Sequence, residues 1–252
     1  MMIVSRKILL YIGVMRTLRI AMAQINTTVG DLEGNVTRCL AAVEEAKNSR
    51  CDLIVFPELA LTGYPPEDLL LKPGFLKQCR HAIDSFARQV EGICAVVGYV
   101  DGEGPVYNAA GVVSNHMLHC TYRKMLLPNY GVFDEKRYFT PGSDFVSFTV
   151  GDVVIGINIC EDTWADDGPH CGLVVDHYAD VLINLSASPY HAGKIYERSE
   201  MLVRRSRACG VAIVYVNLVG GQDELVFDGG SLVFDRSGAC AVSYTHLRAH
   251  ET

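Results

Sequence analysis

The sequence lacks any apolar run long enough to cross a membrane. Residues 8–15, for example, form a stretch of only eight residues that is interrupted by Gly13, whereas a spanning helix needs about 18 apolar residues. Basic residues are also in the minority, 22 against 29 acidic ones, and the run RRSR at residues 204–207 is expected to be a solvated helix face. We therefore predict neither a nucleic-acid partner nor a membrane partner.

Paired-cysteine, serine-hydrolase and nucleotide-binding motifs are missing too. There is no C-x-x-C, no G-x-S-x-G, no Walker loop and no G-x-G-x-x-G. On a hairpin strand His116 and His119 would point to opposite faces, and His170 has no partner motif, so no metal site is predicted. Nine cysteines, an odd number spread from Cys39 to Cys240, favour a reducing compartment, the cytoplasm.

The 252 residues are 49% apolar and 20% charged, enough for one sizeable core. Short apolar strands alternate with amphipathic helices, which is typical of one layered α/β domain. The first helix is expected over residues 36–46 with Asn35 as its N-cap. The other expected helices cover residues 76–90 and 194–208. The expected strands cover residues 18–25, 53–56, 93–100, 109–113, 117–122, 145–150, 153–159, 181–185, 211–216, 231–234 and 239–242.

The two ends differ from this pattern. Residues 1–16 are expected to be an irregular extension, with Met15 as a plausible start of the native protein. Residues 244–252, YTHLRAHET, have no periodicity and are expected to be a non-native tail. This leaves residues 17–243 as the predicted domain, which we expect to be a piece of a longer protein.

Three apolar strands each lead into a residue suited to acyl transfer. Residues 53–56 lead to Glu58, residues 117–122 to Lys124, and residues 153–159 to Cys160. A cysteine attacks as its thiolate, which needs a base or a positive neighbour near neutral pH. Glu58 is the candidate base and Lys124 the candidate cation, although each residue taken alone is more often structural.

The strings around these residues resemble a known family. FPELALTGY at 56–64, YRKMLLPNYGVFDEKRYFTPG at 122–142 and GINICEDTW at 156–164 look like the three signature blocks of the nitrilase (carbon–nitrogen hydrolase) superfamily. The resemblance implies a four-layer α-β-β-α sandwich and a catalytic triad of Glu58, Lys124 and Cys160. It also implies a homo-oligomer, because family members associate through their helices.

Further strings are similar to the glutaminase domain of the glutamine-dependent NAD synthetases: TGYPPEDLLLKPGF at 62–75, NLSASPYHAGK at 184–194 and GGQDELVFDGGS at 220–231. This resemblance implies hydrolysis of the L-glutamine side-chain amide through a cysteine thioester, with no cofactor. In that family the ammonia feeds a C-terminal synthetase domain, which uses ATP, Mg²⁺ and deamido-NAD. No SGGxDS-type loop of such a domain occurs in this sequence, so that domain is expected to be missing.

The same resemblance implies roles for further residues. Glu135 supports the lysine, and the backbone N–H of Glu161 joins Lys124 in stabilising the oxyanion. Tyr130, Ser188 and Lys194 contact the glutamine. Two alternatives stay open at this point: a stand-alone amidase or nitrilase acting on another small amide or nitrile, and a catalytically inactive fragment.

Overall fold

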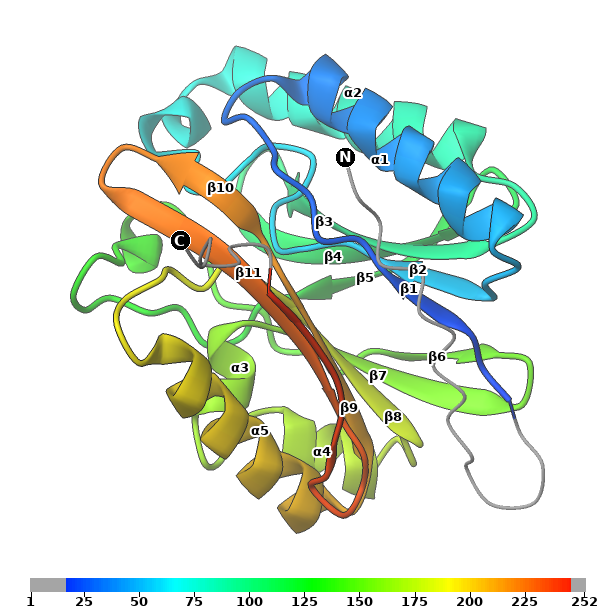
Figure 1. Ribbon diagram of the computed structural model, residues 1–252. Helices are drawn as coiled ribbons and strands as arrows, with labels where there is room; N and C mark the ends of the chain where they lie inside the picture. The colour runs from blue at the N-terminus through cyan, green and yellow to red at the C-terminus, as the bar shows by residue number, and fades with distance from the viewer. Residues whose placement is uncertain (1–16, 246–252) are drawn as a thin grey trace, which may run out of the picture.

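The computed structural model describes residues 17–245, and in it two β-sheets lie face to face with helices on both outer sides (Figure 1). The predicted extension at residues 1–16 lies outside the described residues. So do residues 246–252 of the predicted tail, whereas Tyr244 and Thr245 belong to the last strand. The domain boundaries therefore stay a prediction. Among the described residues, no helix has the length and apolarity needed to cross a bilayer.

The first sheet has five strands in chain order, the first three parallel and the last two antiparallel. Two long helices, α1 and α2, connect the parallel strands and cover their outer face (Figure 1). The elements are β1 (Ile20–Met22), α1 (Leu32–Asn48), β2 (Leu53–Val55), the 3-10 turn η1 (Glu67–Leu71), α2 (Pro73–Gln89), β3 (Cys94–Asp101), β4 (Tyr107–Ser114) and β5 (Met117–Arg123).

The second sheet has seven strands in the order β10-β11-β9-β8-β7-β6, with β12 pairing β11. Its central strands β7, β8 and β9 are parallel, and α4 and α5 pack on its outer face. The elements are η2 (Glu135–Arg137), β6 (Ser147–Val150), β7 (Val153–Ile159), α3 (Glu161–Trp164), α4 (His170–Val175), β8 (Val181–Ser186), α5 (Lys194–Cys209), β9 (Ala212–Asn217), β10 (Val219–Gln222), β11 (Leu225–Phe234) and β12 (Cys240–Thr245).

Strand alternation divides the apolar side chains among the layers. In β1, Ile20 and Met22 belong to the core between the two sheets, whereas Ala21 packs with the core under α1 and α2. On the other side of the molecule, Leu182 of β8 packs under α5, while Ile183 faces the first sheet. The predicted four-layer α-β-β-α sandwich is confirmed.

The predicted N-cap of the first helix was wrong. The helix begins at Leu32, and the Asp31 side chain accepts from the N–H of Gly34 (3.0 Å). Asn35 lies one turn inside the helix, fully buried, where its amide donates to the carbonyls of Thr28 (2.8 Å) and Leu61 (3.2 Å). Both Asp and Asn are good caps, and only the packing decides which of them occupies the end.

Two further details differ from the expectation. The β4–β5 hairpin turns at Asn115 and His116, which both adopt positive φ (47° and 67°), as a two-residue hairpin turn requires. His116 therefore lies in the turn and not on the strand. The sequence analysis also missed β10, because its residues Val219–Gln222 are half glycine and read as a loop.

Candidate active site

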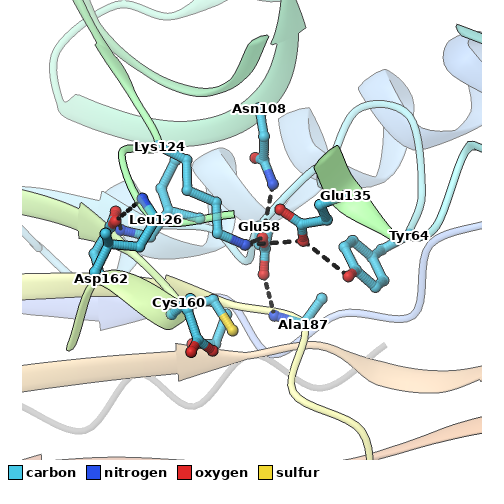
Figure 2. A network of polar contacts seen from close by, with 12 residues as sticks. Glu58, Tyr64, Asn108, Lys124, Leu126, Glu135, Cys160, Asp162 and Ala187 are labelled. Atoms are coloured by element: carbon cyan, nitrogen blue, oxygen red, sulfur yellow. Dashed lines mark hydrogen bonds and ion pairs between the residues drawn. The ribbon is translucent and has the colours of Figure 1, made fainter. Parts of the chain in front are cut away.

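Glu58, Lys124 and Cys160 each follow a strand end, and all three strand ends lie at one edge of the sandwich. Glu58 comes shortly after β2, Lys124 directly after β5, and Cys160 directly after β7. Figure 2 shows the side chains of Glu58, Lys124 and Glu135 converging, with Cys160 beside them. Residues that are 102 positions apart in the sequence, Glu58 and Cys160, thus share one site.

A buried ammonium lies between two carboxylates. Lys124 Nζ donates to Glu58 Oε1 (2.7 Å) and to Glu135 Oε1 (2.8 Å). The three side chains are 0%, 1% and 5% exposed, respectively. The lysine head group is held from two sides at the end of the sandwich, out of reach of solvent.

The Glu58 carboxylate has two more hydrogen-bond donors. The Asn108 amide donates to Oε1 (2.7 Å), and the backbone N–H of Ala187 donates to Oε2 (2.9 Å). Both oxygens are therefore fixed in position, by β4 and by the segment after β8. Sequence reasoning missed Asn108, which directly precedes the predicted strand of residues 109–113; a single amide at the start of that apolar strand was a visible signal.

Backbone contacts between Gly98 and the Glu58 segment position that carboxylate. A Cβ at Gly98 would overlap with Pro57 O, Leu59 N and the carbonyl carbon of Glu58. Leu59 itself adopts a positive φ of 48°, a backbone conformation that residues other than glycine rarely adopt. The Glu58 segment therefore crosses directly over β3, and only a glycine at this point of β3 leaves room for it.

Cys160 lies on a sharp turn between β7 and α3. Its φ of 43° and ψ of −100° are unusual for a residue with a side chain, and strain of this kind is frequent at reactive residues. Its backbone N–H donates to Leu185 O (2.9 Å), and its carbonyl accepts from the Asn184 amide (3.4 Å). The turn is thus held to the neighbouring strand β8 on both sides of the cysteine.

The electrostatics of this site favour a protonated thiol at rest. Burial raises the pKa of Cys160 well above its usual range, Glu58 raises it further, and Lys124 opposes the shift. Burial by itself would lower the pKa of Lys124, but Glu135 and Glu58 raise it well above its usual range, so the ammonium stays charged. Burial raises the pKa of Glu135 to about 7, against the effect of Lys124. A thiol of this kind needs a base when it attacks.

Asp162 connects the cysteine turn to the lysine segment. Its carboxylate is fully buried and accepts from Ile159 N (3.0 Å), Leu126 N (2.8 Å), Met125 N (3.2 Å) and Tyr122 OH (2.7 Å). Burial raises its pKa to about 6. Asp162 follows the cysteine within the string GINICEDTW, but sequence reasoning gave it no role, because four donors from two distant segments are visible only in the folded chain.

Two residues expected to contact substrate lie near the cysteine turn. Tyr130 is 58% exposed, and its hydroxyl donates to both carboxylate oxygens of Glu161 (2.9 and 3.0 Å). Glu161 directly follows Cys160, so the exposed Tyr130 side chain lies beside the cysteine turn.

Ser188 and Lys194 have other partners in the structure. Ser188 is buried, and its hydroxyl accepts from Arg198 Nε (3.3 Å). The Lys194 ammonium contacts Glu197 (3.2 Å) and lies 4.1 Å from the centre of the Trp164 ring. Trp164 ends α3, which begins directly after Cys160. The structure thus places Lys194 close to the cysteine turn without bringing it to the Glu58–Lys124 pair.

The basic run RRSR is only partly the solvated face that was predicted. Arg204 and Arg207 are exposed, but Arg205 is buried. Its guanidinium donates to the carbonyls of Thr163 (2.9 Å) and Trp164 (2.7 Å). Arg205 therefore satisfies the end of α3, the helix that follows Cys160, a role that the pattern of charges alone does not indicate.

A second cluster of reactive side chains lies at the α4–α5 contact, away from Glu58 and Lys124. His170, Cys171 and Cys209 bring one imidazole and two thiols together, with all ligand atoms within 4.8 Å of one another. The sequence analysis found no partner for His170, because its partners are the adjacent residue and a residue 39 positions further along. All nine cysteines are free thiols.

The family-level comparisons agree with this site and fold. The carbon-nitrogen hydrolase family model matches residues 19–248. The chain belongs to that family, and the resemblance noted in the sequence is confirmed.

Two curated relatives of this chain are glutamine-dependent NAD(+) synthetases. The chain is 46% identical over 239 residues to the glutamine-dependent NAD(+) synthetase of Thermotoga maritima, covering 94% of this chain and 41% of that protein. It is 48% identical over 225 residues to the synthetase of the same name from Xylella fastidiosa (88% and 41%). The chain thus spans about 41% of the length of these curated relatives.

Solved structures of similar proteins share the fold of this chain. The glutamine-dependent NAD+ synthetase of Acinetobacter baumannii, in complex with ADP, superposes with a TM-score of 0.85 at 37% identity, covering 90% of this chain and 43% of that one. The amidase of Nesterenkonia sp. AN1, at 23% identity, has a TM-score of 0.79 and covers 90% of this chain and 89% of its own. The latter likeness supports the sandwich fold alone.

Proposed function

We propose that this chain is the glutamine-hydrolysing part of a glutamine-dependent NAD synthetase. The observation that supports this most is the buried Glu58–Lys124 ion pair beside a strained, buried cysteine, in a chain whose relatives have that name. The reaction is hydrolysis of the L-glutamine side-chain amide to glutamate and ammonia. An amide is a poor electrophile with a poor leaving group, so it needs a nucleophile, an acid–base group and oxyanion donors together.

In the first half-reaction the Cys160 sulfur attacks the amide carbon while Glu58 takes the thiol proton. The resting thiol is protonated, so base and nucleophile act together. The amide oxygen becomes an oxyanion, which Lys124 Nζ and the backbone N–H of Glu161 stabilise by about 3 kcal/mol for each donor. Glu58 then gives its proton to the amine as the C–N bond breaks, and ammonia leaves.

In the second half-reaction water attacks the γ-glutamyl thioester. Glu58 takes a proton from the water, the C–S bond breaks, and the proton returns to the sulfur. Asn108 and Ala187 keep the Glu58 oxygens in place during both steps. Glu135 keeps Lys124 charged and oriented, which is the supporting role that the resemblance implies.

The proposed substrate contacts come from the family resemblance. Tyr130 lies beside the cysteine turn, and its phenol can turn from Glu161 to the glutamine. Lys194 supplies a point charge for the α-carboxylate, for which it must exchange its contact with Glu197. Ser188 would contact the α-amino end, with its hydroxyl oriented by Arg198.

The ammonia is proposed to serve a synthetase domain of the whole protein. There ATP and Mg²⁺ would activate deamido-NAD, consistent with the ADP named in the Acinetobacter baumannii structure. The glutaminase step itself needs no cofactor in this scheme. We also propose a homo-oligomer, and a cytoplasmic location consistent with the nine free thiols.

Ammonia release is the test. The chain should release ammonia from L-glutamine faster than from L-asparagine or propionamide, and Cys160→Ala should abolish the release. Equal or greater turnover of an aliphatic amide or nitrile would favour a stand-alone amidase. No turnover, together with no labelling of Cys160 by a glutamine-analogue electrophile, would favour an inactive fragment.

A further inference from the structure

The cluster of His170, Cys171 and Cys209 has the ligand set of a transition-metal site. His170 and Cys171 begin α4, and Cys209 ends α5. One imidazole nitrogen and two sulfurs lie within 4.8 Å of one another. Thiolates and imidazoles together select borderline and soft cations such as Zn²⁺, whereas Mg²⁺ and Ca²⁺ prefer oxygen ligands.

The hydrogen bond of His170 determines which ring nitrogen is available. Its Nδ1 lies 3.2 Å from the backbone carbonyl of Asp162. A carbonyl oxygen only accepts, so Nδ1 is the nitrogen that has the proton, and Nε2 keeps its lone pair. His170 is only 1% exposed, which limits rotation of the ring. A metal-binding histidine is typically oriented by a backbone carbonyl in this way.

The two sulfurs differ in their access to solvent. Cys171 is exposed and Cys209 is half-buried, so an ion can reach the cluster from the surface. Cysteine binds a metal as its thiolate, so a divalent cation displaces both thiol protons when it binds.

Charged side chains also lie near the cluster. Arg205, Asp166 and Asp167 are close enough to interact electrostatically with His170, and Arg205 pairs with Asp166 at 2.7 Å. Asp167 adds a carboxylate on this side of the cluster, which favours a cation, and the two thiolates that form on metal binding are balanced by the +2 charge of the ion.

We propose that His170 Nε2, Cys171 Sγ and Cys209 Sγ bind one Zn²⁺ ion, with a water molecule as the fourth ligand. Binding forms two Zn–S bonds and one Zn–N bond and releases both thiol protons to solvent. Three protein ligands and one water make a four-coordinate Zn²⁺ site. The ion would connect α4 to the end of α5 and, through His170, to the backbone of Asp162. This proposal does not depend on the proposed glutaminase activity.

Co²⁺ serves as the spectroscopic probe for this site. The chain is kept in a phosphine reductant, so that both thiols stay reduced, and is titrated with Co²⁺ and then with Zn²⁺. We expect one Co²⁺ per chain, with thiolate-to-cobalt charge-transfer absorption that one equivalent of Zn²⁺ removes. The titration is repeated with Cys171→Ser, Cys209→Ser and the control Cys240→Ser, which changes another exposed cysteine.

Cys171→Ser and Cys209→Ser should each weaken Co²⁺ binding by more than about 100-fold, the upper end of the loss caused by removing an outer-shell partner. Cys240→Ser should bind like the parent chain. Because Cys171 is exposed, its replacement by serine leaves the core intact, and the test does not depend on the folding of Cys209→Ser. The proposal is wrong if the parent chain shows no charge-transfer band. It is also wrong if the band persists in Cys171→Ser or is lost in Cys160→Ala instead.

Discussion

The carboxylate of Asp162 accepts a 2.8 Å hydrogen bond from the backbone N–H of Leu126. Asp162 lies two residues after Cys160, and Leu126 lies two residues after Lys124. The Cys160 turn and the Lys124 segment are therefore joined by one buried carboxylate, and the relative position of sulfur and ammonium depends on it.

Asp162→Asn is expected to disturb that position. The asparagine side chain has one acceptor oxygen in place of two, and its NH₂ group would face N–H and O–H donors. The donors left without an acceptor should lower the unfolding free energy by roughly 2–3 kcal/mol. A shift of the lysine by about 1 Å would lower kcat by about 100-fold. Denaturant melts and steady-state kinetics check both. Asp167→Asn, at an exposed neighbouring carboxylate, should change neither, and a fully active, fully stable Asp162→Asn would contradict the assigned role.

Gly98→Ala is expected to displace the Glu58 segment. The added methyl group would overlap with backbone atoms of Pro57, Glu58 and Leu59, which cannot rotate away. We expect a loss of about 1–3 kcal/mol in unfolding free energy, as for other overpacked positions, together with a loss of ammonia release. Gly104→Ala is the matched control, because nothing lies within 4 Å of its added carbon. Wild-type kinetics in Gly98→Ala would show that the contact is not needed.

Glu135→Gln is expected to change how stability depends on pH. Burial raises the pKa of Glu135 from 4.5 to about 7, so in this range the folded state binds a proton that the unfolded state has lost. The proton on Glu135 therefore stabilises the folded wild type fully below about pH 4.5, and this stabilisation is lost as the pH rises to about 7. Glu135→Gln, which cannot ionise at this position, should therefore gain stability relative to the wild type as the pH rises through this interval.

Urea melts at a series of pH values measure that difference, with Glu103→Gln at an exposed carboxylate as the control. A constant difference between Glu135→Gln and the wild type would contradict the raised pKa. The same variant should lose ammonia release at pH 7, because the remaining amide no longer balances the Lys124 charge.

Tyr130→Phe separates binding from chemistry. The phenol is largely exposed and contacts Glu161, so its loss should change stability by less than about 0.5 kcal/mol. If the hydroxyl contacts the glutamine, KM should rise by up to about 10-fold, the equivalent of one hydrogen bond, while kcat stays within about two-fold. A fall in kcat at unchanged KM would instead indicate that Tyr130 acts in the transition state.

The family, the sandwich that the family resemblance implies, and most of the helices and strands were predictable from the sequence. Apolar alternation and helical spacing are local properties, and the strings around Glu58, Lys124 and Cys160 each lie within one short segment. The N-cap at Asp31 and the burial of Arg205 were not predictable in this way. Asp31 and Asn35 are both suitable N-caps, and the run RRSR contains three arginines. Only the packing of the folded chain decides which residue caps the helix and which arginine is buried.

The tertiary structure alone decided how the reactive groups are connected. The sequence indicated that a base, a cation and a thiol are present. It contained no sign that Asn108 orients Glu58, that Asp162 joins the Cys160 turn to the Lys124 segment, or that Cys209 meets His170. The physical reason is that these contacts join segments tens of residues apart, and their distances depend on how two sheets and their helices pack and not on any local pattern.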